Sequence, residues 1–238
     1  MTERLQKLMA RSGLCSRRTA EDWLREGRVC VNGAVASLGD KADPDCDSIE
    51  VDGRALELEQ SHVYIMLHKP RGYVTTLSDE FGRKTAAELV ADCGKRVFPV
   101  GRLDMDSEGL LLFTNDGEWM QSLLHPKNEI NKVYMVTVSG ALEKAPERLM
   151  AIRDLDGEAI RPAQVERISQ EKGRMCLRIT IHEGKNRQIR RMCAQVGLRV
   201  ERLMRVKEHT LTLGSLPSGK WRYLTDEELQ SVKGSDEK

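Results

Sequence analysis

The sequence contains few aromatic residues and no long apolar run. Aromatic residues make up 4% of its 238 residues, and the apolar residues, 39% of the total, occur in short blocks. A membrane-spanning helix needs about 18 or more consecutive apolar residues, so none is expected. The opening stretch, MTERLQKLMARSG, intersperses charges and holds no hydrophobic core of a secretion signal. We therefore expect a cytoplasmic protein with no membrane partner, long enough for one large or two modest domains.

Cysteine and histidine lack the spacing of metal sites. The five histidines form no His-x-His or His-x-x-x-His pair, so a structural zinc site is not expected. The six cysteines are scattered, which predicts reduced thiols packed as small apolar residues rather than a disulfide framework. These cysteines are Cys15, Cys30, Cys46, Cys93, Cys176 and Cys193.

The net charge is close to zero, with 38 Lys and Arg against 37 Asp and Glu. This balance argues against a nucleic-acid partner, but it hides an uneven distribution. Residues 1–32 carry seven bases and four acids, residues 40–60 carry two bases and eight acids, and residues 184–207 carry eight bases and one acid. Each basic segment is compatible with a solvated face or with a nucleic-acid contact.

The first 60 residues predict a small module of helices and short strands. Helices are expected over Glu3–Arg11 and Ser16–Glu26, the second capped by its first residue. Strands are expected over Arg28–Asn32 and Ser48–Asp52, which run into the turn pairs Asn-Gly and Asp-Gly. The polar stretch Glu57–His62 is expected to link this module to the rest of the chain.

From residue 61 to residue 232, short strands dominate and helices intervene irregularly. This pattern predicts an α+β fold with a mostly antiparallel sheet. The tail, residues 233–238, is expected to be disordered. Strands are expected over Val63–Leu67, Val97–Val100, Leu110–Thr114, Val133–Val138, Val165–Ile168, Met175–His182, Leu198–Val206, Thr210–Leu213 and Trp221–Leu224, and helices over Thr85–Asp92, Asp116–Leu124, Leu142–Ile152, Asn186–Val196 and from Thr225.

An acidic loop precedes one of these strands. Asp104, Asp106 and Glu108 fall within five residues, ahead of the apolar run that begins at Leu110. Hard divalent cations bind several oxygen ligands, but the loop lacks the twelve-residue calcium pattern. A single catalytic carboxylate and a plain polar loop before a strand are the remaining interpretations, and the spacing alone favours the polar loop.

A basic helix and a strand tyrosine complete the set of candidate sites. Gly184 opens a helix whose first turns are rich in Lys and Arg, which suits phosphate contacts. The spacing is not that of a Walker loop. Tyr134 lies on one face of a predicted strand, where it is either a core aromatic or one of the few residues available to stack on a base.

Together these segments resemble the pseudouridine synthases of the RsuA/RluB type. Gly101-Arg102-Leu103-Asp104 and its continuation to Gly117 are similar to the catalytic motif of that family. Lys69–Tyr73 resembles its first motif, and Lys132–Tyr134 and Gly184–Met192 resemble its later motifs in the same order. Residues 4–33 resemble the small RNA-binding module named after ribosomal protein S-four.

The resemblance implies a cofactor-free isomerisation of one uridine in ribosomal RNA. It makes Asp104 the catalytic carboxylate, attacking either the sugar C1′ or the base C6. It places Arg190 against Asp104, Ile189 against the base and Tyr134 on the target uracil, which must be flipped out of its helix. The candidate RNA contacts are Arg102, Lys69, Arg71, Arg187 and Arg191, with Arg4, Lys7, Arg17, Arg18 and Arg28 in the small module.

Several alternatives stay open at the level of sequence. The Tyr73–Thr85 loop resembles that of large-subunit enzymes, so we expect large-subunit rRNA as the substrate, with small-subunit rRNA as the alternative. A non-catalytic RNA-binding or ribosome-assembly factor is a second hypothesis. A metal-dependent phosphotransferase using Asp104, Asp106 and Glu108 is a third. We expect a monomer, and the target uridine and the form of the RNA substrate remain open.

Overall fold

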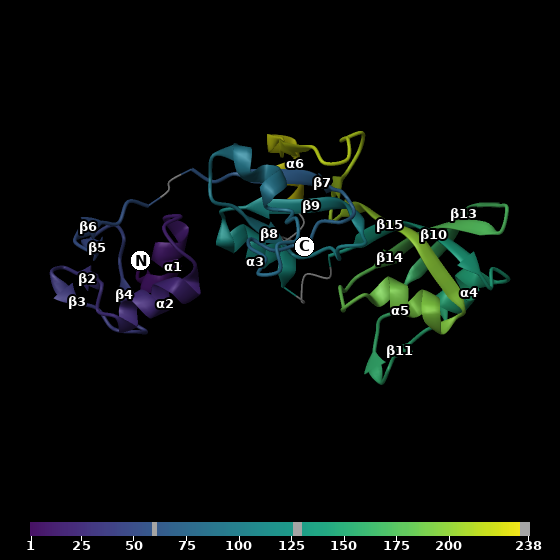
Figure 1. Cartoon of the computed structure of the whole chain (residues 1–238), viewed down its shortest axis with the longest axis horizontal. Coiled ribbons are helices and arrows are strands. Elements are labelled where there is room, and N and C mark those ends of the chain that lie inside the picture. The colour runs from purple at the N-terminus through teal and green to yellow at the C-terminus, as the bar shows by residue number, and fades with distance from the viewer. Residues whose placement is uncertain (59–60, 126–129, 234–238) are drawn as a thin grey trace. The chain divides into compact units, whose positions relative to one another are not determined.

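The computed structural model describes residues 1–58, 61–125 and 130–233, and these residues form two compact units (Figure 1). The first consists mainly of Met1–Val63 and the second of most of the remaining chain. Part of the predicted linker and residues 234–238 of the predicted disordered tail lie outside the described residues. None of the described helices has the length and apolar composition needed to cross a membrane.

The first unit packs two helices against small sheets. Helix α1 spans Leu5–Arg11 and helix α2 spans Arg17–Arg25. The Ser16 hydroxyl accepts a hydrogen bond from the Thr19 amide at 3.0 Å, which confirms the predicted N-cap. The apolar faces of both helices, including Leu5 and Leu24, are buried in one core. The strands are β1 (Glu3–Arg4), β2 (Val29–Val31), β3 (Ala34–Val35), β4 (Lys41–Ala42), β5 (Ile49–Val51) and β6 (Arg54–Ala55).

The predicted hairpin turns are present, but the predicted first helix starts late. Asn32 and Asp52 adopt left-handed backbone conformations followed by glycine, as Asn-Gly and Asp-Gly turns require. Strands β3, β2, β5 and β6 lie in that order in one sheet. The helix predicted from Glu3 begins at Leu5 instead, because Glu3 and Arg4 are extended and pair with β4.

Within the described residues of the second unit, nine strands form one sheet (Figure 1). Its main order is β13-β14-β10-β15-β9-β7-β17, with β8 paired to β9 and β16 to β15. Every neighbouring pair is antiparallel except β15 and β9, which confirms the mostly antiparallel α+β fold. The strands are β7 (Tyr64–Lys69), β8 (Phe98–Val100), β9 (Glu108–Thr114), β10 (Lys132–Gly140), β13 (Gln164–Glu171), β14 (Arg174–Ile181), β15 (Leu198–Glu208), β16 (Leu211–Thr212) and β17 (Trp221–Tyr223). A separate hairpin pairs β11 (Asp154–Leu155) with β12 (Glu158–Ala159).

The helices of the second unit follow the predictions with three differences. They are α3 (Gly117–Leu124), α4 (Ala145–Met150), α5 (Gln188–Gln195) and α6 (Asp226–Lys233). The helix predicted from Asn186 begins at Gln188, because Arg187 has a left-handed backbone. The helix predicted over Thr85–Asp92 is a 3₁₀ helix, η1, over Glu88–Cys93. Helix α4 is shorter than predicted because its proline is tolerated only in the first turn. Thr225 and Glu228 exchange hydrogen bonds at the start of α6, which confirms the predicted capping box.

The only parallel junction of the described sheet depends on one glycine. Gly109 of β9 lies opposite Arg205 of β15 and has φ +110°, a conformation that favours glycine. A Cβ atom on Gly109 would lie 2.2 Å from the Arg205 carbonyl oxygen. The two strands therefore meet only because residue 109 has no side chain.

We expect Gly109→Ala to lower the free energy of unfolding by about 2–5 kcal/mol, because it adds backbone strain to a clash with a neighbouring strand. The matched control is Gly117→Ala at the start of α3, where a Cβ would meet no atom within 4 Å. Alanine should change stability there by about 1 kcal/mol or less. Chemical denaturation measures both. Equal stability of Gly109→Ala and wild type would contradict the close approach.

Candidate active site

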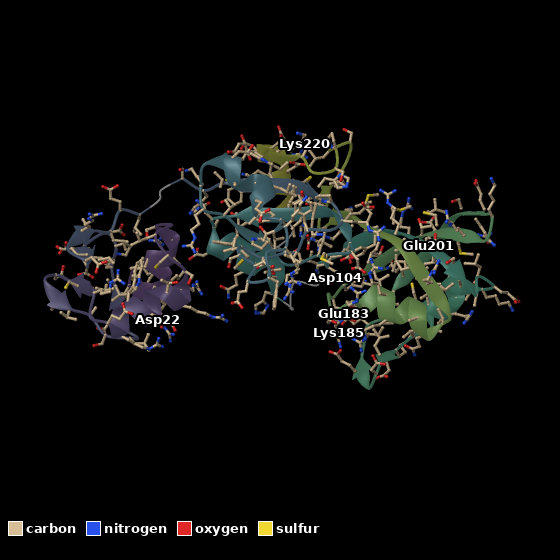
Figure 2. The ribbon with its side chains drawn as sticks, viewed as in Figure 1. Asp22, Asp104, Glu183, Lys185, Glu201 and Lys220 are labelled. Carbon is tan, nitrogen blue, oxygen red and sulfur yellow. The ribbon has the colours of Figure 1, made fainter. Side chains whose placement is uncertain are left out.

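Asp104 lies in the loop between β8 and β9. Figure 2 shows it where the part of the second unit that contains β9 meets the part that contains α5. The Ser107 amide donates to the Asp104 carbonyl at 3.0 Å and closes a turn after it. The Asp104 side chain is 34% exposed. Its carboxylate is therefore accessible on a backbone that is held in place.

A buried lysine holds this loop from β7. The Lys69 side chain is fully buried, and its Nζ donates to the carbonyl oxygens of Pro70, Asp104 and Ser107 at 3.1, 3.0 and 2.8 Å. Burial lowers the pKa of Lys69 to about 8, although the neighbouring carboxylates act in the opposite direction. The prediction that Lys69 contacts RNA phosphate does not agree with this arrangement, because its ammonium is enclosed by backbone acceptors.

Two further contacts fix the same loop from the segment that follows β7. The Gly72 amide donates to the Met105 carbonyl at 2.7 Å. The Thr75 hydroxyl donates to the Leu103 carbonyl at 2.7 Å and lies 3.2 Å from the Leu103 amide. Sequence reasoning missed Thr75, because no local pattern indicates a contact between residues 28 positions apart.

Arginines at the start of α5 converge on Asp106. The Arg187 guanidinium donates to both carboxylate oxygens of Asp106 at 3.0 Å, and its Nη1 lies 3.6 Å from Oδ2 of Asp104. Arg190 Nε lies 3.3 Å from Oδ2 of Asp106, and Arg190 Nη2 donates to the Asp106 carbonyl at 2.8 Å. Such bidentate, charge-assisted pairs orient both partners.

This cluster differs from the arrangement that the resemblance implied. Arg190 was expected against Asp104, but it contacts Asp106 and the Ser107 hydroxyl instead. Arg187 is the arginine beside Asp104. Partial burial acts to raise the pKa of Asp106, but hydrogen bonding by Arg187 and the charge of Arg190 outweigh it and lower this pKa. Asp106 therefore carries one negative charge, which both arginines contact and which offsets part of their combined positive charge.

Tyr134 lies beside a buried charge that the sequence analysis did not single out. It is 8% exposed on β10, opposite Arg205 of β15. Arg205 is 2% exposed, pairs with Glu208 at 3.2 Å and donates from Nε to the Leu110 carbonyl at 2.8 Å. Burial raises the pKa of the Tyr134 hydroxyl, so this group stays protonated. The alternation of β15, in which Leu203 and Arg205 share a buried face, was the signal that could have revealed Arg205.

The remaining predicted residues of the second unit are dispersed around this centre. Ile189 is 4% exposed on the buried face of α5. Arg71 is exposed and donates to the Glu201 carbonyl at 3.3 Å. Arg191 donates to the Asp156 carboxylate at 2.7 Å. Arg102 is exposed at the loop that carries Asp104.

In the first unit, the predicted cations divide into exposed and paired groups. Arg4, Arg17 and Arg18 are exposed. Lys7 pairs with Glu3 at 2.8 Å, so part of its charge is neutralised. Arg28 pairs with Asp52 at 2.6 Å, and its guanidinium lies 4.5 Å from the centre of the Trp23 ring.

A cavity of about 560 Å³ opens beside Asp104. This volume falls within the range of about 300–1,000 Å³ that is typical of ligand pockets. Its walls come from the Asp104 loop, Arg187 and the segment 74–83, and they include Arg102 but neither Tyr134 nor Arg190. A carboxylate on a fixed backbone, beside a guanidinium and an open cavity, is suited to act as a nucleophile or to stabilise a developing positive charge. Among the described residues, no three His, Cys, Asp or Glu side chains gather in a way that would hold a metal ion.

Comparisons with known proteins identify related families for both units. Residues 63–195 match the model of the RNA pseudouridylate synthase family, and residues 3–45 match the S4 domain model. The chain is 42% identical to ribosomal large subunit pseudouridine synthase B of Bacillus subtilis, over 97% of this chain and 96% of that protein. It is 41% identical to an uncharacterized RNA pseudouridine synthase of Aquifex aeolicus, over 98% of this chain and 94% of that protein.

Two further relatives agree with these matches. The dual-specificity RNA pseudouridine synthase RluF of Escherichia coli is 37% identical over 95% of this chain and 77% of its own length. A crystal structure of a pseudouridylate synthase superposes with a TM-score of 0.68 and 30% identity, over 96% of this chain and 99% of that one. The similarity therefore extends over nearly all of the chain.

The ammonium of Lys69 is expected to lose its proton near pH 8, whereas ordinary lysines do so near pH 10.4. Between these values the unfolded chain binds more protons, so the free energy of unfolding should rise as the pH rises from about 8 to about 10.4. The NMR resonances of lysine side chains report the titration, and the signal that is missing in Lys69→Met is that of Lys69. In this variant the free energy of unfolding should not rise over the same pH range. A Lys69 signal that titrates only above pH 10 would contradict the lowered pKa and show that the partners of the ammonium outweigh the cost of its burial.

Proposed function

The chain belongs to the RNA pseudouridylate synthase family, and we propose that it converts one uridine of ribosomal RNA to pseudouridine. The observation that carries this proposal is the Asp104 carboxylate, which lies beside Arg187 at 3.6 Å on a loop held by Lys69 and lines an open cavity. The glycosidic bond between N1 and C1′ breaks, C5 bonds to C1′, and the C5 proton is released to water while N1 gains a proton. Atoms balance without a cofactor.

Asp104 is proposed as the residue that reacts with the substrate. A carboxylate can attack C1′ of the sugar or C6 of the base, and both routes use the same position of Asp104. Either route uses the carboxylate as an anion, and Nη1 of Arg187 lies 3.6 Å from its Oδ2. Arg190 is proposed as a positioning residue, because it binds the carbonyl and carboxylate of Asp106 and thereby holds the same loop.

Tyr134 and Ile189 are proposed to receive the target uracil. A base inside a stacked helix is out of reach of Asp104, so the nucleotide must be flipped out. Stacking on an aromatic ring offsets part of the cost of flipping. Tyr134 is held in place by its burial next to Arg205 and is 8% exposed, so a base would stack on it only through this small exposed part. Ile189 supplies an apolar wall from α5.

The small N-terminal unit is proposed to bind RNA by its phosphates. The S4 domain match over residues 3–45 and the exposed Arg4, Arg17 and Arg18 support this role. Lys7 and Arg28 are proposed as weaker contacts, because each is already paired with an acidic side chain. Arg71 and Arg102 are the proposed contacts of the larger unit, with Arg187 and Arg191 as weaker ones for the same reason, since they pair with Asp106 and Asp156. Proteins recognise double-stranded RNA mostly through the shape of the helix and through contacts with its backbone, which agrees with these proposed phosphate contacts.

The finer assignment is large-subunit rRNA. The Bacillus subtilis relative is named a large-subunit enzyme and resembles this chain over nearly its whole length, which supports the choice. Small-subunit rRNA is the alternative.

We further propose that residues 1–60 and 61–232 are separate domains, that the protein is a monomer, and that it acts in the cytoplasm. Mapping pseudouridines in rRNA from a strain that lacks this gene would identify the target.

Asp104→Asn is expected to lower the release of tritium from rRNA labelled at C5 of uridine by at least about a thousandfold, because an amide cannot replace the reacting carboxylate. RNA binding should persist. The matched variant is Asp106→Asn, which removes the neighbouring carboxylate and should leave reduced but measurable release. Turnover by Asp104→Asn at the wild-type rate would refute the assignment, and wild-type binding without any release would identify a non-catalytic RNA-binding factor.

The affinity for rRNA should fall steeply with salt if several phosphates are neutralised. Arg18→Gln, which removes an exposed cation at the start of α2, should reduce the slope of log affinity against log salt by about 1. Arg25→Gln is the control, because Arg25 lies on the same helix but pairs with Asp22 at 2.7 Å. Filter binding at several salt concentrations measures both slopes. A slope for Arg18→Gln equal to that of wild type would exclude this phosphate contact.

A further inference from the structure

The cavity beside Asp104 is lined in part by an exposed aromatic ring. Phe81 is 81% exposed and belongs to the segment 74–83 that forms one wall of the cavity. Single exposed apolar residues are common on protein surfaces and need no explanation by themselves. Phe81 differs because it shares the lining of one cavity with the proposed reacting carboxylate, in a chain with only three phenylalanines.

The loop that carries Phe81 is organised by one carboxylate. The Asp79 side chain is 5% exposed and accepts hydrogen bonds from the amides of Phe81 and Arg83 at 3.1 and 2.8 Å. It also accepts from Nε and Nη2 of Arg83 at 3.0 and 2.5 Å. Four donors from residues 81 and 83 therefore converge on Asp79. The backbone at Phe81 and the guanidinium of Arg83 are fixed relative to each other.

Arg83 covers the aromatic ring without burying it. Its guanidinium carbon lies 5.1 Å from the centre of the Phe81 ring, within the range of a cation–π contact. The ring remains largely exposed despite this contact. An exposed ring next to a planar cation is a combination suited to stacking unpaired bases, since every base offers a π-face and the guanidinium is attracted to nearby phosphate and aromatic groups.

We propose that Phe81 and Arg83 form a stacking subsite for an unpaired nucleobase of the substrate RNA, next to the target uridine. The proposal rests on the proposed function. Flipping the target out of its helix removes a stacking partner from the adjacent nucleotide. That nucleotide enters the cavity beside Asp104, where Phe81 replaces the lost stack. The subsite selects RNA in which the neighbour of the target is single-stranded, and it tolerates any of the four bases.

The test compares Phe81→Ala with two control variants. Phe81→Tyr keeps an aromatic ring. Leu77→Ala removes another exposed apolar side chain, 46% exposed, from the same loop at a place that does not line the Asp104 cavity. All three changes are at exposed positions, and thermal unfolding verifies that each variant folds. Tritium release is measured on rRNA labelled at C5 of uridine and taken from a strain that lacks the gene.

Phe81→Ala is expected to raise the KM for RNA by about 5- to 150-fold, which corresponds to the loss of one base stack, while kcat stays within about twofold. Phe81→Tyr and Leu77→Ala should leave both constants within about twofold of wild type. In the Asp104→Asn background, Phe81→Ala should weaken RNA binding by the same factor as it raises KM. This binding measurement separates stacking from any effect on the chemical step.

Two results would overturn the subsite. One is a KM for Phe81→Ala equal to that of wild type, and the other is an equal rise in KM for Phe81→Ala and Leu77→Ala. Either result leaves the isomerase activity of the wild-type protein intact, so the proposed function survives. Absence of tritium release by wild type, in contrast, refutes the proposed function and the subsite that rests on it.

Discussion

The arrangement of the active site depends on one buried ammonium group. Lys69 ends β7 in the interior of the sheet, where a charge without partners would be strongly unfavourable. Its three acceptors are backbone carbonyls, two of them in the loop that carries Asp104. The loop therefore has to come to the lysine in the folded protein. The same contact satisfies the charge and sets the position of the reacting carboxylate.

The junction of β9 with β15 provides the second constraint. This parallel pair joins β7, β9 and β17 to the strands β10, β13, β14 and β15 (Figure 1). The pairing of Arg187 with Asp106 holds the start of α5 next to the Asp104 loop. Gly109 permits the close approach because a side chain would collide with Arg205. Arg205 is buried at the same point and lies opposite Tyr134. Tyr134 and the loop that carries Asp104 are therefore both held by the junction of β9 with β15.

The near-neutral charge of the chain has a structural counterpart. Residues 184–207 hold eight bases and one acid, yet several of these bases pair with acidic side chains outside this segment. Arg187 and Arg190 bind Asp106, Arg191 binds Asp156, and Arg205 pairs with Glu208 inside the core. A basic segment in the sequence is therefore not a continuous basic surface in the fold. Recognition by a few placed cations would limit binding to unrelated RNA, since non-specific affinity comes mainly from phosphate neutralisation.

Local signals in the sequence determined the helices, the hairpin turns and the order of the motifs. The Ser16 cap, the Asn32 and Asp52 turns and the Thr225–Glu228 capping box each involve residues within about four positions of one another, so chain spacing specifies them. The short strand β1 was missed because its partner, β4, lies in a distant part of the chain and no local pattern reports it.

Only the tertiary structure decided how the charged groups are paired. Lys69 and Asp104 are 35 positions apart, and Arg187 and Asp106 are 81 positions apart. The sequence contains these residue types, but it does not show which aspartate pairs with Arg187. That choice depends on distances in the folded protein, where Arg187 lies 3.0 Å from Asp106 and 3.6 Å from Asp104. Burial decided that Lys69 is an anchor rather than a phosphate contact, and exposure decided that Phe81 is available to a ligand. Burial and exposure are properties of the packed fold, because they depend on which distant segments cover a side chain.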